Sequence, residues 1–214
     1  EAAIAGAIAA KYRNTGQTCV CANRIYVHQD IYDEFCEGFT KAAANIQTGE
    51  GLDPATDQGP LIDEAALAKV EEHISDAQNQ GGQILLGGHQ HKLGGLFFEP
   101  TVIKNANDEM LIAHEETFGP VAPLFSFATE EEVIARANDT PFGLASYFYT
   151  TDLAKSWRVS EQLEYGMVGL NTGIVSTEMA PFGGVKESGM GREGSKYGVD
   201  DYLETKYISI AGID

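Results

Sequence analysis

A cysteine in a glycine-containing turn is the residue of this sequence with the clearest capacity for chemistry. Cys19 ends the segment Gly16-Gln-Thr-Cys19, which follows a predicted helix, and the cation Arg13 lies six residues earlier. A thiolate is an effective nucleophile when it is accessible and electrostatically supported. The spacing alone leaves two interpretations open, a catalytic nucleophile or the small buried core residue that free cysteine usually is.

Three other patterns carry weaker signals. The adjacent carboxylates of Glu115 and Glu116 fit acid–base work, although solvated or capping roles are commoner. The segment 189–194 matches the glycine pattern of dinucleotide-binding turns, but the 20 residues after it are too few for the strand–helix–strand unit that the pattern requires. His89 and His91 lack further ligands at suitable spacing, so no metal site is predicted and a solvated loop explains them.

Composition limits the class of protein and its partners. Hydrophobic residues make up 43% of the 214 residues and charged residues 21%, which is ordinary globular composition. The net charge of −18 repels phosphate backbones and anionic headgroups, so neither nucleic acid nor a membrane is an expected partner. No apolar run approaches the roughly 20 residues that span a bilayer. Three cysteines fit a reducing cytoplasm better than a secreted disulfide framework.

The elements that must position these residues alternate between helix and strand. The chain ends in a stretch over 202–210 that we expect to be a strand leaving the domain, after a long glycine-rich loop over 172–195. The alternation predicts an α/β fold with a mainly parallel sheet flanked by helices. Helices are expected over 1–13, 30–46, 63–80, 129–138 and 153–163, and strands over 23–28, 83–86, 97–103, 121–127, 144–150 and 167–171.

Taken together, three ordered motifs resemble the aldehyde dehydrogenase superfamily. Gly16-Gln-Thr-Cys19 is similar to its nucleophile motif, Glu115-Glu-Thr-Phe118-Gly-Pro to its nicotinamide-side motif, and Pro181-Phe182-Gly-Gly to its substrate-tunnel motif. The resemblance covers essentially all 214 residues. The segments 13–21 and 188–198 look like the succinate-semialdehyde dehydrogenase branch.

The resemblance implies a thiol mechanism with NAD or NADP as cofactor. In the family's scheme Cys19 attacks the aldehyde, its backbone N–H helps to hold the oxyanion, and water hydrolyses the resulting thioester. Glu116 then holds the nicotinamide ribose and Phe118 lies beside the ring. Phe182 lines the aldehyde tunnel.

The same branch implies a binding site for an anionic group of the substrate. It also implies a redox lock, meaning a reversible disulfide that inactivates the nucleophile. Arg13 and Ser176 match the positions that hold the distal carboxylate of a small semialdehyde, either succinate semialdehyde or a near homologue such as glutarate semialdehyde. If the loop is shifted by one residue, Thr177 takes the position of Ser176. Without the resemblance, Arg13 is interpreted as a cation at a helix end, where the helix dipole favours it. Cys21 is the implied redox partner of Cys19, although the loop must bend for the two thiols to meet.

The resemblance also implies an architecture. Residues 1–200 form the catalytic domain and residues 201–214 an oligomerisation arm, which implies a homodimer or homotetramer of the whole enzyme. The family's general-base glutamate, its oxyanion asparagine and its cofactor-binding domain lie upstream of Glu1. We therefore expect the cofactor to be bound mainly by an upstream domain absent from this chain, and no turnover by the chain alone.

Two alternatives from other classes remain at this point. One is a catalytically silent thiol domain used for assembly or redox sensing, in which Cys19 reacts with an alkylating agent no faster than Cys36. The other is a Cys–His hydrolase, for which His114 is the candidate partner by spacing.

Overall fold

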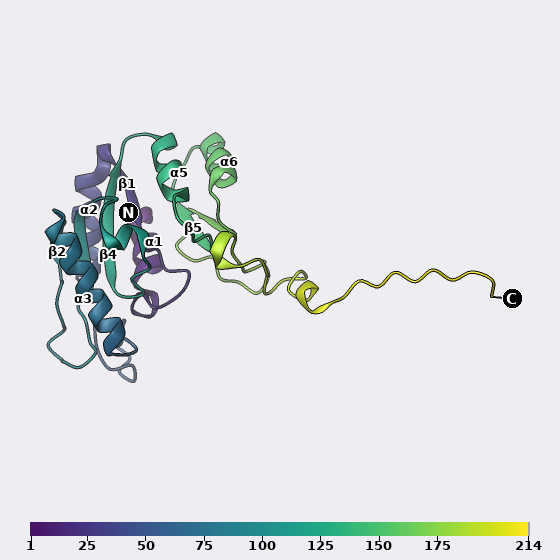
Figure 1. Cartoon of the computed structure of the whole chain (residues 1–214). Coiled ribbons are helices and arrows are strands. Elements are labelled where there is room, and N and C mark those ends of the chain that lie inside the picture. The colour runs from purple at the N-terminus through teal and green to yellow at the C-terminus, as the bar shows by residue number, and fades with distance from the viewer. Residues whose placement is uncertain (214) are drawn as a thin grey trace.

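The fold alternates helices and strands as expected. The computed structural model describes residues 1–213, and a long C-terminal segment leaves the compact body (Figure 1). The helices are α1 (Ala2–Tyr12), α2 (Tyr32–Ala43), α3 (Glu64–Asn79), α4 (Leu111–His114), α5 (Glu130–Asn138) and α6 (Leu153–Gln162). The strands are β1 (Ile25–His28), β2 (Gln83–Leu86), β3 (Thr101–Ala106), β4 (Val121–Phe127), β5 (Ala145–Phe148) and β6 (Met167–Leu170).

The strands form two sheets. The larger sheet has the order β1-β4-β3-β2, and β5 pairs with β6 in the smaller one. β1 with β4, β3 with β4, and β5 with β6 run parallel, whereas β2 runs antiparallel to β3. The predicted α/β class with a mainly parallel sheet is confirmed, but the strands are divided between two sheets instead of sharing one.

The larger sheet lies between helices on both faces. Val102 of β3 and Leu124 of β4 belong to the core cluster that contains residues of α1 and α2. Their neighbours Ile103 and Phe125 belong to the cluster of α3. Successive residues of a strand point to opposite faces, so a strand buried on both faces needs an unbroken apolar run. The sequence Val-Ala-Pro-Leu-Phe at the start of β4 meets this requirement, and all five residues are buried.

Side-chain caps set two helix starts, and one expectation about α2 is wrong. Asp63 accepts a hydrogen bond from the backbone N–H of Ala66, and Thr129 accepts one from Glu132. The expected start of a helix at Asp30 is incorrect because residues 29–31 form a 3-10 turn. The backbone N–H of Asp30 donates to His28 Nδ1, and α2 begins at Tyr32.

Two strand predictions also need correction. β3 begins at Thr101 instead of residue 97, after Pro100, which has no N–H to offer a ladder. The expected strand over 202–210 is wrong: Asp200–Tyr202 is a 3-10 turn and residues 203–213 have no regular secondary structure. A strand requires a hydrogen-bonded partner, and this segment runs away from the body (Figure 1).

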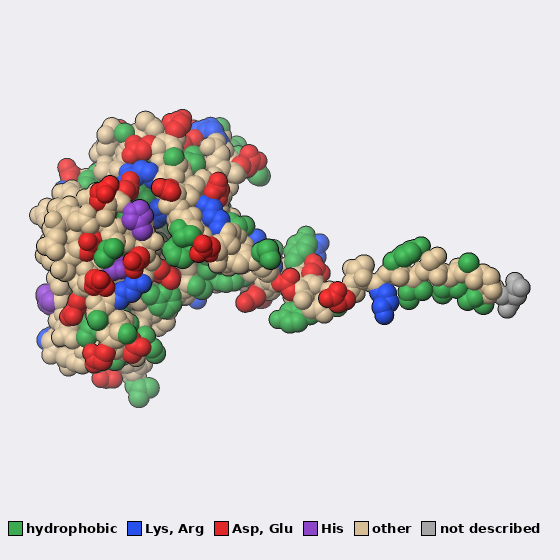
Figure 2. Space-filling view, viewed as in Figure 1, with side chains coloured by type: hydrophobic (Ala, Val, Ile, Leu, Met, Phe, Trp, Pro, Cys, Tyr) green, Lys and Arg blue, Asp and Glu red, His purple; other side chains and the backbone are tan. Residues whose placement is uncertain are grey.

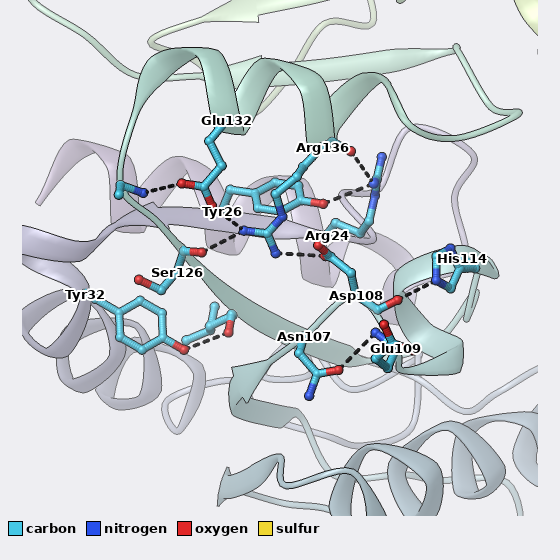
Figure 3. Close-up of polar contacts among 12 residues, drawn as sticks. Arg24, Tyr26, Tyr32, Asn107, Asp108, Glu109, His114, Ser126, Glu132 and Arg136 are labelled. Carbon is cyan, nitrogen blue, oxygen red and sulfur yellow. Dashed lines mark hydrogen bonds and ion pairs between the residues drawn. The ribbon is translucent and has the colours of Figure 1, made fainter.

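An arginine pair fastens α5 to the sheet. Arg24 donates to the carbonyl oxygens of Arg136 and Ala137, both at 2.8 Å. The Arg136 guanidinium lies over the Tyr26 ring at 4.9 Å from its centroid and pairs with Asp108 at 2.8 Å (Figure 3). These contacts satisfy donors of both guanidiniums, so the helix and the strand ends are held as one unit.

The surface agrees with the acidic composition. Acidic side chains are spread over the visible face of the body, and apolar side chains line the C-terminal segment (Figure 2). Among residues 1–213, none of the helices is both long and apolar enough to cross a membrane. The same described residues contain no cluster of three or more metal-ligating side chains.

Candidate active site

The turn that carries Cys19 is built at the end of α1. Beyond Tyr12 the chain enters a 3-10 turn in which Asn14 and Thr15 have left-handed backbone conformations, with φ of 49° and 62°. The Tyr12 hydroxyl donates to the Thr101 carbonyl oxygen at 2.9 Å, which anchors this helix end on β3. Cys19 is exposed at the end of the turn, as a nucleophile requires.

The nucleophile turn packs against the loop that carries Glu116 and Phe118. Gly16 has φ of 74°, and a Cβ atom there would lie 2.1 Å from the Gly119 carbonyl oxygen. Only glycine fits this close approach. The Gln17 side chain attaches the turn to a different loop, because its amide donates to the Pro60 carbonyl oxygen and its carbonyl accepts from the Ile62 N–H at 2.8 Å. The first two predicted motifs therefore pack directly against each other at Gly16 and Gly119.

Glu116 and Phe118 lie in this loop on either side of a buried residue, Thr117. Both side chains are exposed, whereas Thr117 between them is 1% exposed. Phe118 has φ of 51°, a conformation that non-glycine residues adopt only when their surroundings impose it. Partial burial raises the pKa of Glu116, while the ammonium groups of Lys11 and Lys69 act in the opposite direction.

Arg13 and Ser176 are brought together across 163 positions of the chain. The Arg13 Nη1 atom donates to the Ser176 hydroxyl oxygen at 3.3 Å. The neighbouring Thr177 instead accepts a hydrogen bond from the Met179 N–H. Of the two hydroxyls that the sequence left open, Ser176 is therefore the one beside the guanidinium.

Cys21 lies in a bend, half-buried and close to the end of α1. Its backbone N–H donates to the Thr18 carbonyl oxygen at 2.8 Å, so the segment between Thr18 and Cys21 is a turn and not extended chain. Its thiol contacts the Arg13 carbonyl oxygen at 3.4 Å. Burial raises the pKa of Cys21, and the charge of Lys11 partly offsets this effect.

One large cavity gathers some of the predicted residues and not others. A cavity of about 860 Å³ is lined by Cys19, Cys21 and Glu116, together with edge residues of β1 and β5. Arg13, Ser176, Phe118 and Phe182 do not line it. Phe182 is partly buried and pairs through its backbone with Glu193. His114 also lines the cavity, and its Nε2 contacts the Asp108 carbonyl oxygen (Figure 3). The structure shows no hydrogen bond between His114 and the Cys19 thiol among the described residues.

Sequence reasoning missed three residues that support this site. Lys11 is 1% exposed at the end of α1, Asn23 holds the loop of Glu116, and His73 lies beneath that loop. His73 lies in α3 and Asn23 in a bend before β1, and the local sequence at these two positions contains no sign of such a role. The signal available in the sequence was a charged residue, Lys11, in an otherwise alanine-rich apolar helix.

The arrangement fits a nicotinamide cofactor on the evidence of its own side chains. Within the described residues the Glu116 carboxylate is absent from every hydrogen bond and ion pair, so its oxygens are free to accept from sugar hydroxyls. The Phe118 ring is 39% exposed beside it, which offers an apolar face to a planar ring. The exposed Cys19 thiol lines the same cavity as Glu116, and an accessible thiol can perform nucleophilic chemistry on a carbonyl carbon.

Comparison with known proteins identifies the family to which the chain belongs. The sequence model of the aldehyde dehydrogenase family matches residues 1–208. A 3-sulfolactaldehyde dehydrogenase of Pseudomonas putida is 58% identical over 100% of this chain and 44% of its own length. A glutarate-semialdehyde dehydrogenase of Pseudomonas aeruginosa is 58% identical with the same coverage. The crystal structure of succinate-semialdehyde dehydrogenase from Burkholderia pseudomallei superimposes with a TM-score of 0.93 at 57% identity, covering 94% of this chain and 42% of that one.

The fold and site therefore define an α/β domain that carries an exposed thiol beside a large cavity. The chain belongs to the aldehyde dehydrogenase family, in the branch that includes the succinate-semialdehyde dehydrogenases. It spans about two-fifths of the length of the relatives reported above.

Proposed function

We propose that this chain is the catalytic portion of an NAD(P)-dependent dehydrogenase that oxidises a small aldehyde with a distal anionic group. The observation that carries the proposal is the contact between Arg13 and Ser176. A guanidinium with a hydroxyl beside it provides a directional, charge-assisted grip on a carboxylate. Succinate semialdehyde is the substrate we favour, with glutarate semialdehyde as a near homologue. The relatives act on succinate semialdehyde, glutarate semialdehyde and a sulfonated aldehyde, all of which carry such a group.

The proposed reaction uses Cys19 as nucleophile. Its thiolate adds to the aldehyde carbon, and the oxyanion of the thiohemiacetal is held in part by the Cys19 backbone N–H. Glu116 and Phe118 would hold the ribose and the nicotinamide of NAD or NADP, which would supply the site with a hydride acceptor. Water then hydrolyses the thioester, which releases the dicarboxylate and regenerates the thiol. Phe182 lines the aldehyde tunnel in this proposal.

The first test removes the side chain proposed to bind the substrate carboxylate, Arg13, in the complete enzyme. Arg13→Ala is expected to lower the ratio of kcat/KM for succinate semialdehyde to kcat/KM for butanal by about 30- to 160-fold, because a charged hydrogen bond contributes about 2–3 kcal/mol. Arg158→Ala is the matched control, since Arg158 pairs with Glu130 at the surface. An unchanged ratio in Arg13→Ala refutes the substrate assignment while leaving the reaction class intact.

The C-terminal segment is proposed as the assembly arm. Its apolar side chains, among them Tyr202, Leu203, Tyr207 and Ile210, are exposed. A segment that is already extended can add as a strand to the sheet of a neighbouring subunit and bury these side chains. We therefore expect the complete enzyme to be a homodimer or homotetramer.

A further inference from the structure

The loop that carries Glu116 and Phe118 is held from beneath by a buried histidine of α3. We propose that His73 is a positioning residue for cofactor binding, acting through Thr117 to fix the orientation of the two side chains that face the nicotinamide and its ribose. The inference rests on the proposed function, since it assigns a purpose to the geometry of that loop.

The first observation is the contact between His73 and Thr117. The imidazole is 1% exposed, and its Nδ1 lies 3.0 Å from the Thr117 hydroxyl oxygen. Its Nε2 lies 3.5 Å from the Glu115 carboxylate. Burial lowers the pKa of His73, with Glu115 opposing this effect and Lys69 adding to it, so the ring is neutral at pH 7. In the tautomer that fits, Nδ1 accepts from the Thr117 hydroxyl, and Nε2 has no hydrogen-bond partner among the described residues.

The second observation is that Thr117 is also held at its backbone. The Thr117 N–H donates to the Asn23 side-chain oxygen at 3.0 Å, and the Asn23 amide donates to the Glu115 carbonyl oxygen at 2.9 Å. Asn23 follows Cys19 by four residues, so it links the nucleophile turn to this loop. Asn23 fixes the backbone of Thr117 and His73 fixes its side chain.

The third observation concerns the loop conformation that the contacts of Thr117 with His73 and Asn23 maintain. Phe118 keeps a left-handed conformation that costs free energy without outside support, and Glu116 stands free of partners among the described residues. If the His73 contact is lost, the buried Thr117 hydroxyl has no acceptor and the loop can relax around it. The side chains on either side of Thr117 would then lose their fixed orientation, which weakens the binding of a cofactor that needs both.

A general structural role predicts a different result from a positioning role. A residue that only contributes to the core lowers the stability of the whole domain, whereas a positioning residue changes the mobility of the loop and the KM for the cofactor. Three variants in the complete enzyme separate these roles. His73→Leu removes the acceptor, and His73→Asn offers an amide oxygen near the place of Nδ1. Ile74→Val removes one buried methylene from the same helix without touching Thr117.

The experiment measures steady-state kinetics and amide hydrogen exchange of residues 115–119. His73→Leu is expected to raise the KM for NAD(P)+ about tenfold with the KM for the aldehyde unchanged, and to accelerate exchange at the Thr117 amide at least tenfold. His73→Asn is expected to recover most of both effects, and Ile74→Val to show neither. Exchange that stays at the wild-type rate in His73→Leu overturns the inference.

The exchange measurement does not depend on activity, so it separates the inference from the proposed function. Wild-type enzyme that reduces neither NAD+ nor NADP+ with any aldehyde refutes the proposed function. Active wild-type enzyme with an unchanged cofactor KM in His73→Leu refutes the positioning role alone.

Discussion

Lys11 is a fully buried lysine at the end of α1, and its burial has an electrostatic cost. Burial lowers the pKa of Lys11 from 10.5 to about 8, although the charges of Cys21 and Glu116 act to raise it. At pH 7 the lysine is protonated in both the folded and the unfolded state, so the folded state bears a desolvation penalty of ~3 kcal/mol. Between pH 8 and 10.5 the unfolded state binds the extra proton, so stability increases as pH rises through this range.

We therefore expect Lys11→Met to be more stable than wild type at pH 7. The free energy of unfolding in urea should rise by up to ~3 kcal/mol. The difference should shrink as the pH rises above 8, because the folded wild-type protein releases its Lys11 proton before the unfolded protein does, and it should be smallest above pH 10.5. Lys41→Met is the control, because Lys41 is exposed on α2. A Lys11→Met protein less stable than wild type at pH 7 would show that the ammonium has a stabilising partner that outweighs its desolvation.

Single residues were predictable where a motif marked them, and unpredictable where a distant partner gives them their role. Arg13 and Ser176 were assigned from resemblance, and the structure places them in contact. The importance of His73 depends on Thr117, 44 positions away, and that of Asn23 on a loop more than 90 positions away. Short-range patterns contain no information about such pairs, so these residues had the appearance of ordinary helix and strand-flanking positions.

At the scale of elements, the turn after α1 determines whether the two thiols can react. The turn from Thr18 to Cys21 is closed by a backbone hydrogen bond, so the chain between the two thiols is bent, as a Cys19–Cys21 disulfide requires. We predict that the two thiols can meet there. Peroxide should oxidise the exposed Cys19 thiolate to the sulfenic acid with release of water. Attack by Cys21 then forms the disulfide and releases a second water.

Peroxide treatment is therefore expected to give an intramolecular crosslink between Cys19 and Cys21 that dithiothreitol reverses. Because burial raises the pKa of Cys21, the crosslinking rate should increase as pH rises above neutrality and more of this thiol ionises. Peptide mapping by mass spectrometry measures the product, and the buried Cys36, at 2% exposure, is an internal control. Cys21→Ser should abolish the crosslink. Absence of a reversible crosslink in the wild-type chain would rule out the redox lock.

Elements were predicted well where apolar periodicity was strong. The stripe of Leu67, Val70, Ile74 and Ala77 is buried as the helical spacing required, and β4 matches its predicted range. The errors have specific physical causes. Pro100 delays β3, and a 3-10 turn at residues 29–31 delays α2. The segment over 202–210 has strand-like composition, but pairing depends on a partner and not on composition.

At the scale of the whole molecule, the open surfaces indicate what the chain needs from outside itself. The cavity beside Cys19 is bounded by β1 of one sheet and β5 of the other, and these two strands are not paired with each other. The C-terminal segment adds exposed apolar side chains (Figure 2). Both surfaces are costly to leave in water, so additional protein is expected to cover them in the working enzyme.

This expectation gives a direct prediction for the 214-residue chain. The purified chain should not reduce NAD+ or NADP+ at steady state with succinate semialdehyde, because the resemblance assigns the general base and most of the cofactor site to other parts of the enzyme. The complete enzyme should do so, and Cys19→Ala should abolish its activity.

In the chain alone, Cys19 should still react faster than Cys36 with iodoacetamide, since one thiol is exposed and the other buried. Equal labelling of the two thiols, together with an inactive complete enzyme, would favour the silent thiol domain. Steady turnover by the chain alone would show that residues 1–214 already contain a sufficient active site.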